Sequence, residues 1–217
     1  MLSRLLLVAC LLLFSGCGKA SLEGRWVGVS DKTTLSFGPH ELCAEVTPEP
    51  ENVVIHRWKL DGSNLTLTSL THDWNPWKAP GQARQWSVRQ RGDTLTLKNG
   101  ATSREFRREA PVKVRPELVG AWSGNTRLGV FAPHGDLLII LKHPAFPKAK
   151  VPAGYIGEYY RLTLDGQRIK MDGLSPIKLR RHMIAEFEVK GEQLTFKWDK
   201  GSAVWDRVTS IPWSAYK

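Results

Sequence analysis

Short runs in which apolar and polar residues alternate recur along most of the chain. Clear examples are residues 64–68 (NLTLT), 93–97 (DTLTL) and 193–197 (QLTFK). A period of two turns successive side chains to opposite faces, so each run predicts a β-strand with one face on a core and the other in water. Outside the N-terminal segment no stretch carries a helical period. The pattern therefore predicts an all-β protein.

Dipeptides of a charged residue followed by glycine separate these runs. They are Asp61-Gly62, Arg91-Gly92, Asp165-Gly166 and Lys190-Gly191. Tight hairpin turns need a positive φ, which glycine adopts without steric cost. The segments HRWKL-DG-SNLTLT and YRLTL-DG-QRIKM therefore predict antiparallel hairpins, and so do the segments around Gly92 and Gly191. We expect six to eight antiparallel strands in each stretch of about 90 residues.

The second half of the chain repeats the first. LEGRW at 22–26 is matched by LVGAW at 118–122, and four further blocks follow in the same order in both halves. Five collinear pairs indicate a duplicated domain. The blocks are FGPHEL with FAPHGDL, LDG with LDG, GDTLTLK with GEQLTFK, and SREFRR with SAVWDR. We place the first repeat at 22–109, the second at 118–209, and a stiff, proline-containing linker at 110–117 between them.

Each repeat opens with a Gly-x-Trp motif and ends in an arginine. In a sheet that curls shut, the indole can plug one end of the cylinder, the glycine permits close backbone approach, and the arginine can stack on the indole. This combination resembles the lipocalin and fatty-acid-binding superfamily, and avidin-type barrels also begin this way. The resemblance implies two small antiparallel up-and-down β-barrels in tandem. By the same resemblance, the residues that close the barrels are Gly24, Trp26 and Arg108, and Gly120, Trp122 and Arg207.

The N-terminal segment has the layout of a secretory signal. One positive charge precedes an apolar run, which small residues close before Cys17. The sequence LFSGC resembles the bacterial lipobox, which implies that residues 1–16 are removed and that Cys17 is lipidated. The anchor would hold the protein in the bacterial cell envelope, with the periplasmic face of the outer membrane favoured over the inner membrane. The alternative is an ordinary signal peptide that ends near a cysteine.

The cysteine count and the net charge bear on disulfide formation and on the kind of partner. After processing, Cys43 is the one remaining thiol, so no internal disulfide can form, and we expect Cys43 to be a buried apolar side chain. The formal net charge of +10 becomes +9 when Arg4 leaves with the signal. This surplus favours anionic neighbours such as lipid head groups or acidic proteins. We expect no nucleic-acid partner for an exported, anchored protein, and a basic surface without a dedicated partner is the alternative.

The loop at 71–81 (THDWNPWKAPG) is the most suggestive candidate for a binding site, because strand alternation does not explain two tryptophans in a proline-broken connection. Exposed aromatic side chains flanked by cations suit a sugar face, a lipid head group or a partner protein. The alternative is that both indoles fold back over the barrel mouth. The candidate ligand or partner residues are Trp74, Trp77, Lys78, His72 and Arg84.

The other residues considered as functional sites give weaker indications of binding or catalysis. His40 and His134 recur in F-x-P-H segments, where we expect turns with the histidine facing water. The remaining histidines are scattered, without metal-ligand spacing, so we expect no metal and no cofactor. We expect residues 142–155 to form a basic flap. We expect Glu186 and Glu188 to lie on the solvent-exposed face of a strand. No catalytic motif is present, so we expect no enzyme.

The sequence thus favours a non-enzymatic, membrane-anchored lipoprotein with two lipocalin-like barrels. It would bind a small amphiphile, an anionic lipid or an envelope protein through loops at the barrel mouths. Barrels of about 90 residues have short strands and leave little room for a deep internal site. The alternative is a protein-interaction or inhibitor module with solid-cored barrels.

Overall fold

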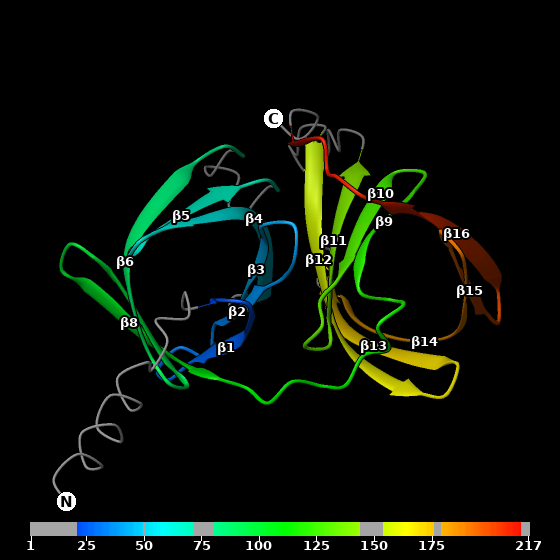
Figure 1. Cartoon of the computed structure of the whole chain (residues 1–217), viewed down its shortest axis with the longest axis horizontal. Coiled ribbons are helices and arrows are strands. Elements are labelled where there is room, and N and C mark those ends of the chain that lie inside the picture. Colours follow the sequence, from blue (N-terminus) through cyan, green and yellow to red (C-terminus); the bar gives the residue numbers. More distant parts are fainter. Residues whose placement is uncertain (1–20, 50, 72–79, 144–153, 176–178, 214–217) are drawn as a thin grey trace, which may run out of the picture.

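Two closed β-barrels, each of eight antiparallel strands, lie side by side in the computed structural model (Figure 1), which describes residues 21–49, 51–71, 80–143, 154–175 and 179–213. The predicted all-β, up-and-down tandem architecture is confirmed. The first barrel consists of β1 (Gly24–Gly28), β2 (Thr34–Phe37), β3 (Leu42–Pro48), β4 (Glu51–Asp61), β5 (Asn64–Ser69), β6 (Ala83–Arg91), β7 (Thr94–Asn99) and β8 (Thr102–Arg108). The second consists of β9 (Gly120–Gly124), β10 (Arg127–Phe131), β11 (Asp136–His143), β12 (Gly154–Asp165), β13 (Arg168–Ser175), β14 (Leu179–Lys190), β15 (Gln193–Trp198) and β16 (Gly201–Val208).

The hairpin turns follow the glycine signals of the sequence. Asp61 pairs with Asn64, so Gly62 is the first residue of a two-residue turn, and its φ is 57°. Gly166 takes the same place between β12 and β13, also with a φ of 57°. A side chain at either position would strain the backbone, which explains why the turn contains glycine.

The strand register aligns the two barrels residue by residue. Trp26 pairs with Arg108 at the closure of the first barrel, and Trp122 pairs with Arg207 at the closure of the second. The intervening ladders keep this correspondence; for example, Leu67 lies opposite Arg84, as Met171 lies opposite Met183. Residues at matching places in the two ladders are called register equivalents below.

The barrels are packed against each other through a third apolar cluster, which lies outside both interiors. Its members come from the outer faces of β3 and β4 in one barrel and of β9 to β12 in the other, together with Leu70 and Ile211. Gly157 shows how close the approach is, because a Cβ built there would lie 2.7 Å from Cγ1 of Ile55. From the sequence we predict two copies in tandem but no contact between them. The structure therefore adds a shared interface to the predicted tandem.

The linker after β8 also packs against the barrels. Val114 is buried in the core of the second barrel, and the backbone N–H of Val112 donates to the carbonyl of His134 (3.1 Å). Glu109, the last residue before the linker, forms ion pairs with Arg25 of the first barrel (2.9 Å) and Arg161 of the second (3.0 Å). These contacts hold the relative placement of the two barrels.

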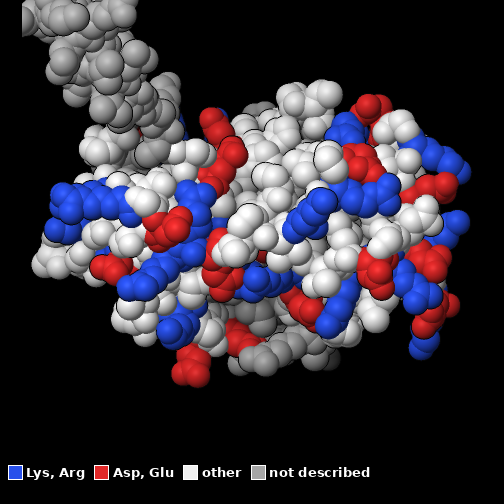
Figure 2. Space-filling model, turned by 60° about the horizontal axis from the view of Figure 1, so that its bottom comes forward, with Lys and Arg blue, Asp and Glu red and all other residues white. Residues whose placement is uncertain are grey.

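The surface charge is mixed. Figure 2 shows Lys and Arg side chains interspersed with Asp and Glu over both barrels on the face that it displays. Within the described part of the chain, no helix has the length and apolar character needed to cross a bilayer.

Candidate functional site

One end of each barrel is closed by the Gly-x-Trp motif and the late arginine. The indole N–H of Trp26 donates to the carbonyl of Leu22 (2.8 Å), and the guanidinium of Arg108 lies 4.3 Å from the Trp26 ring centroid. Trp122 donates likewise to Leu118 (2.8 Å), with Arg207 at 4.2 Å from its ring. Both indoles are fully buried.

The arginines also hold the chain that enters each barrel. Arg108 donates to the carbonyls of Glu23 (2.9 Å) and Ser21 (3.2 Å), and Arg207 donates to those of Val119 (3.2 Å) and Glu117 (2.7 Å). The two glycines make room for these arginines. Gly24 and Gly120 adopt φ values of 130° and 127°, and a Cβ built on them would meet the guanidinium at 3.0 and 3.3 Å.

The interior of the first barrel contains a network of charged side chains centred on Glu45. Its carboxylate pairs with Arg84, with Arg104 (3.2 Å) and with Nε2 of His56 (3.2 Å), and Arg104 also pairs with Asp31 (2.8 Å). Burial alone would raise the pKa of Glu45. The hydrogen bond from His56 and the charges of His56 and Arg84 outweigh burial and hold this pKa far below its ordinary value. These five residues are called the Glu45 network.

The second barrel carries apolar or smaller side chains at the register equivalents of this network. Ile139 replaces Glu45, and Tyr160 replaces His56. Further round the barrel, the second-barrel equivalents of Arg84, Trp86 and Arg104 are Met183, Ala185 and Ala203. The changes remove three charges and an indole from the interior, whereas Glu158 introduces one buried carboxylate where the first barrel has Val54. The duplicated barrels therefore have different interiors.

These replacements line a cavity of about 510 Å³ in the second barrel, called the second-barrel hollow. The inward-facing walls come from Leu137, Ile139, Tyr160, Met171, Met183, Ala185, Phe196, Ala203 and Trp205. The volume lies within the range of roughly 300–1,000 Å³ that is typical of small-molecule sites. Such sites are mostly apolar with a few polar groups, and here the Tyr160 hydroxyl donates to the buried Glu158 (3.1 Å).

Two glycines shape one wall of the hollow. A Cβ at Gly124 or Gly129 would lie within 2.4 Å of the Trp205 indole, so the absence of side chains lets that ring lie against β9 and β10. Phe196 packs edge-on against the same indole, with centroids 5.4 Å apart. The wall is therefore preformed, and it keeps the indole out of the cavity.

The hollow opens at the end of the second barrel opposite the Trp122 plug. Its rim is formed by the turn at Arg127 and by the β15–β16 hairpin with Trp198, Asp199 and Lys200. Trp198 is 45% exposed, whereas tryptophan side chains are highly buried on average. The described rim therefore combines an accessible indole with two cations and one carboxylate.

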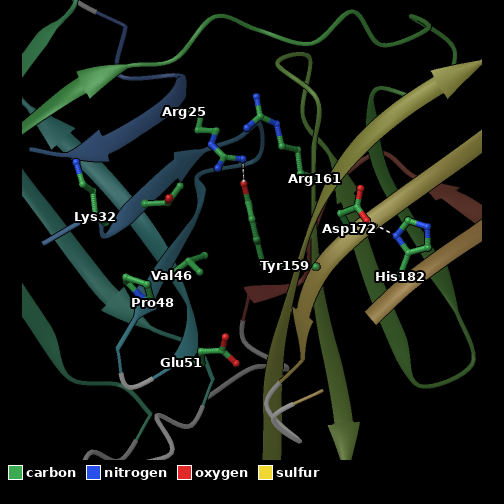
Figure 3. Close-up of a pocket in the computed structure, with 11 residues that line it drawn as sticks. Arg25, Lys32, Val46, Pro48, Glu51, Tyr159, Arg161, Asp172 and His182 are labelled. Carbon is green, nitrogen blue, oxygen red and sulfur yellow. Dashed lines mark hydrogen bonds and ion pairs between the residues drawn. The ribbon is translucent and has the colours of Figure 1, made fainter. Parts of the chain in front are cut away.

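A second candidate is the inter-barrel cleft, with a volume of about 570 Å³, drawn in Figure 3. Arg25 donates to the Tyr159 hydroxyl (2.5 Å), Arg161 pairs with Glu109, and His182 pairs with Asp172. Burial lowers the pKa of Arg25, but the surrounding Tyr159, Asp136 and Glu109 raise it overall. Burial and the charge of Asp136 raise the pKa of Tyr159 well above its ordinary value. Because these charges compensate one another, the cleft is best explained as the junction that joins the barrels.

His134 corrects the expectation that both histidine turns face water. Its imidazole is only 8% exposed, and Nε2 lies 2.9 Å from the Ser36 hydroxyl of the first barrel and 3.4 Å from the Asp136 carboxylate. The interface between the barrels covers it. His40, at the equivalent turn, is half-buried and has a φ of 57°.

The sequence-predicted binding residues are not brought together as a described site. His72, Trp74, Trp77 and Lys78 lie outside the described residues, as does Cys17. Arg84 is described, and its guanidinium belongs to the Glu45 network. Cys43 is a free, buried thiol, as expected, and burial raises its pKa well above the ordinary value. Among the described residues, no group of three His, Cys, Asp or Glu side chains is placed to hold a metal ion.

Sequence reasoning missed the second-barrel hollow. The signal lay in the comparison of the repeats, since Glu45, Arg84 and Arg104 of the first copy have no charged counterparts in the second. That comparison needs the strand register, which aligns residues across loops of different length. No protein-family model, curated protein or solved structure matches the chain.

Proposed function

We propose that the protein is a lipid-anchored lipoprotein of the bacterial envelope whose second barrel binds the apolar part of a small amphiphile. The observation that supports this function is the second-barrel hollow, a preformed apolar cavity that opens to solvent beside an exposed indole. Each methylene group that leaves water for such a cavity contributes about 0.8 kcal/mol. The proposed role is binding, not catalysis.

The proposal is tested by filling the hollow. The protein is secreted with Cys17→Ser and a cleavable signal in place of residues 1–16, so that it can be handled without detergent. Native mass spectrometry with dodecanol is expected to show one bound molecule per chain. Ala203→Trp, which points into the hollow, should abolish binding. Val204→Trp is the matched control, because Val204 is 53% exposed on the outer face of the same strand and should leave binding intact.

The result that would overturn the proposal is equal binding by the Ala203→Trp and Val204→Trp variants, provided that both are folded. Circular dichroism of both variants checks the fold. Absence of dodecanol binding by the unsubstituted barrels would also reject the proposal.

A second function is favoured for the first barrel by the Glu45 network, because charged side chains occupy its interior. This barrel suits a solid platform for a protein partner in the envelope. A Trp74→Ala/Trp77→Ala variant tests the platform in a pull-down from envelope extracts. Loss of one specific protein supports the platform, whereas an unchanged set of captured proteins rejects a platform that uses these tryptophans.

The proposed lipid anchor is tested with cysteine variants. Metabolic labelling with a radioactive fatty acid is expected to label the full chain and to fail with Cys17→Ser. Cys43→Ser is the matched control and should keep the label, because Cys43 is buried inside the first barrel. Label in the Cys17→Ser variant would reject the anchor. Fractionation should place the labelled protein in the outer membrane.

A further inference from the structure

The rim of the second-barrel hollow differs from the same end of the first barrel in its charge. Arg127 is the first residue of β10, directly after the turn from β9, and its register equivalent in the first barrel is Thr33. Lys200 lies in the β15–β16 hairpin, where the first barrel has Ala101. Two cations therefore occur at the rim of the barrel that carries the hollow, and neither of their register equivalents is charged, although the longer β1–β2 turn of the first barrel contains Asp31 and Lys32.

These two cations have no acidic partner among the described residues, whereas three cations at the plugged end of the barrel do. On the same barrel, Arg168, Lys190 and Arg207 each lie within 4 Å of a carboxylate. The side chains of Arg127 and Lys200 form no ion pair or hydrogen bond with another described residue. Two described acids line the hollow: Asp199 on the rim, and the buried Glu158, which accepts a hydrogen bond from the Tyr160 hydroxyl. Arg127, Lys200 and Asp199 together give the rim a net positive charge, and Glu158 is the buried acid of an otherwise mostly apolar cavity.

A third difference accompanies the cations. Trp198 stands on the rim at the register equivalent of Asn99, and it is 45% exposed. An indole has an apolar body and a polar N–H, so it suits the boundary between a buried tail and a solvated head group. Indole, cations and hollow are thus found together at one end of one barrel.

From this arrangement we infer that the second-barrel hollow selects a single-chain amphiphile with an anionic head group. The tail lies between Met183, Phe196 and Trp205, and the head group lies at the rim beside Arg127 and Lys200. The inference rests on the proposed function, because the hollow must take up an apolar tail. It adds the sign of the head-group charge and the two residues that recognise it.

The test compares four molecules with the same dodecyl tail: dodecanoate, dodecyl phosphate, dodecanol and dodecyltrimethylammonium. Their affinities are measured near pH 8 by displacement of N-phenyl-1-naphthylamine, an uncharged fluorescent probe, from the Cys17→Ser protein. We expect the two anions to bind several-fold more tightly than the alcohol, and the cation to bind most weakly. The comparison of carboxylate with phosphate shows which anion the rim prefers.

The rim cations are then removed together by Arg127→Gln and Lys200→Gln. Partly exposed ion pairs are individually weak, so the double variant should bind dodecanoate about three- to tenfold more weakly while its affinity for dodecanol is unchanged. Arg168→Gln with Lys190→Gln is the matched control, because it removes the same charge at the plugged end of the same barrel. We expect the control to change neither affinity.

The outcomes separate the inference from the function on which it rests. If the alcohol binds as tightly as the anions, or if the rim and control variants weaken dodecanoate binding equally, the selection of anions is wrong and the hollow remains a binding site. If the probe and all four molecules fail to bind, the proposed function is wrong. A preference for the cation would overturn the inference outright.

Discussion

Arg104 on β8 and Ala203 on β16 are register equivalents, lying opposite Leu97 and Phe196, yet they belong to barrels with different interiors. Arg104 forms an ion pair with Glu45 at 3.2 Å, whereas Ala203 lines the second-barrel hollow. In the present protein, one copy has a network of charged side chains in its interior, and the other has a mostly apolar cavity with one buried acid, Glu158. This difference between the copies underlies both the proposed function and the predictions below.

Removing the charge of Glu45 should destabilise the first barrel. Glu45→Gln leaves Arg84 and His56 without their carboxylate, and leaves Arg104 with Asp31 alone. Breaking a buried ion pair costs about 3–5 kcal/mol, and because Arg84 is 39% exposed we expect about 2–3 kcal/mol. Urea unfolding measures the loss. Asp31→Asn is the control, since Asp31 is 44% exposed and should cost about 1 kcal/mol or less. Equal losses would contradict a central role for Glu45.

The same carboxylate should make stability depend on acid pH. The pKa of Glu45 is lower in the folded protein than its ordinary value of 4.5, so its contribution is fully present above about pH 4.5 and is lost as the pH falls below it. The unfolding free energies of the original protein and Glu45→Gln should therefore converge as the pH is lowered from about 6 to about 3. Urea titrations at several pH values test this. A constant gap would show that Glu45 does not titrate with folding.

The closure arginines should stabilise their barrels through both stacking and hydrogen bonding. Arg108→Gln removes the contact with Trp26 and the bonds to two carbonyls, with an expected cost of about 1–2 kcal/mol in the free energy of unfolding. Arg108→Lys should not restore stability, because lysine lacks the planar fork that donates to two acceptors. Arg107→Gln, at an exposed neighbour on the outer face, is the control. Rescue by lysine would assign the effect to charge alone.

Gly129 should control the width of the second-barrel hollow. Gly129→Leu introduces the residue found at its register equivalent, Leu35. Its Cβ would lie 2.3 Å from Trp205, so the indole must move, and the adjacent hollow offers the space. We expect at least about a tenfold loss of dodecanol affinity and a stability loss of about 1–3 kcal/mol from overpacking. Undiminished affinity in the folded variant would show that Trp205 does not form the wall of the ligand site.

The fold could be predicted from the sequence because its determinants are local. Alternation sets the faces of each strand, and glycines with positive φ, such as Gly62 and Gly166, set the turns. The duplication showed which strands belong to each barrel. These signals do not depend on which side chains meet across a barrel, so they can be recognised in the sequence alone.

The interface between the barrels had a weaker signal. Residues 137–141 (LLIIL) and 53–55 (VVI) are unbroken apolar runs, which are typical of strands buried on both faces. In the structure, Leu138 and Ile140 face the other barrel, while Leu137 and Ile139 face their own interior. Covering of the outer face also explains why His134 is buried and does not face water.

The hollow was beyond prediction for a different physical reason. Its existence depends on side chains from at least five strands, among them Ile139, Met183 and Ala203, which are far apart in sequence. No single one of these residues differs from an ordinary core residue. The cavity forms only because these residues lie at similar levels along the axis of one barrel. The strand register is needed to recognise that they do.

The most direct measurement is a crystal structure of the Cys17→Ser protein with 12-bromododecanoate, using the anomalous scattering of bromine to locate the end of the tail. The account predicts one bromine site per chain, enclosed by Phe196, Met183 and Trp205 in the second barrel. A bromine site inside the first barrel or in the inter-barrel cleft, with the second-barrel hollow empty, would contradict it.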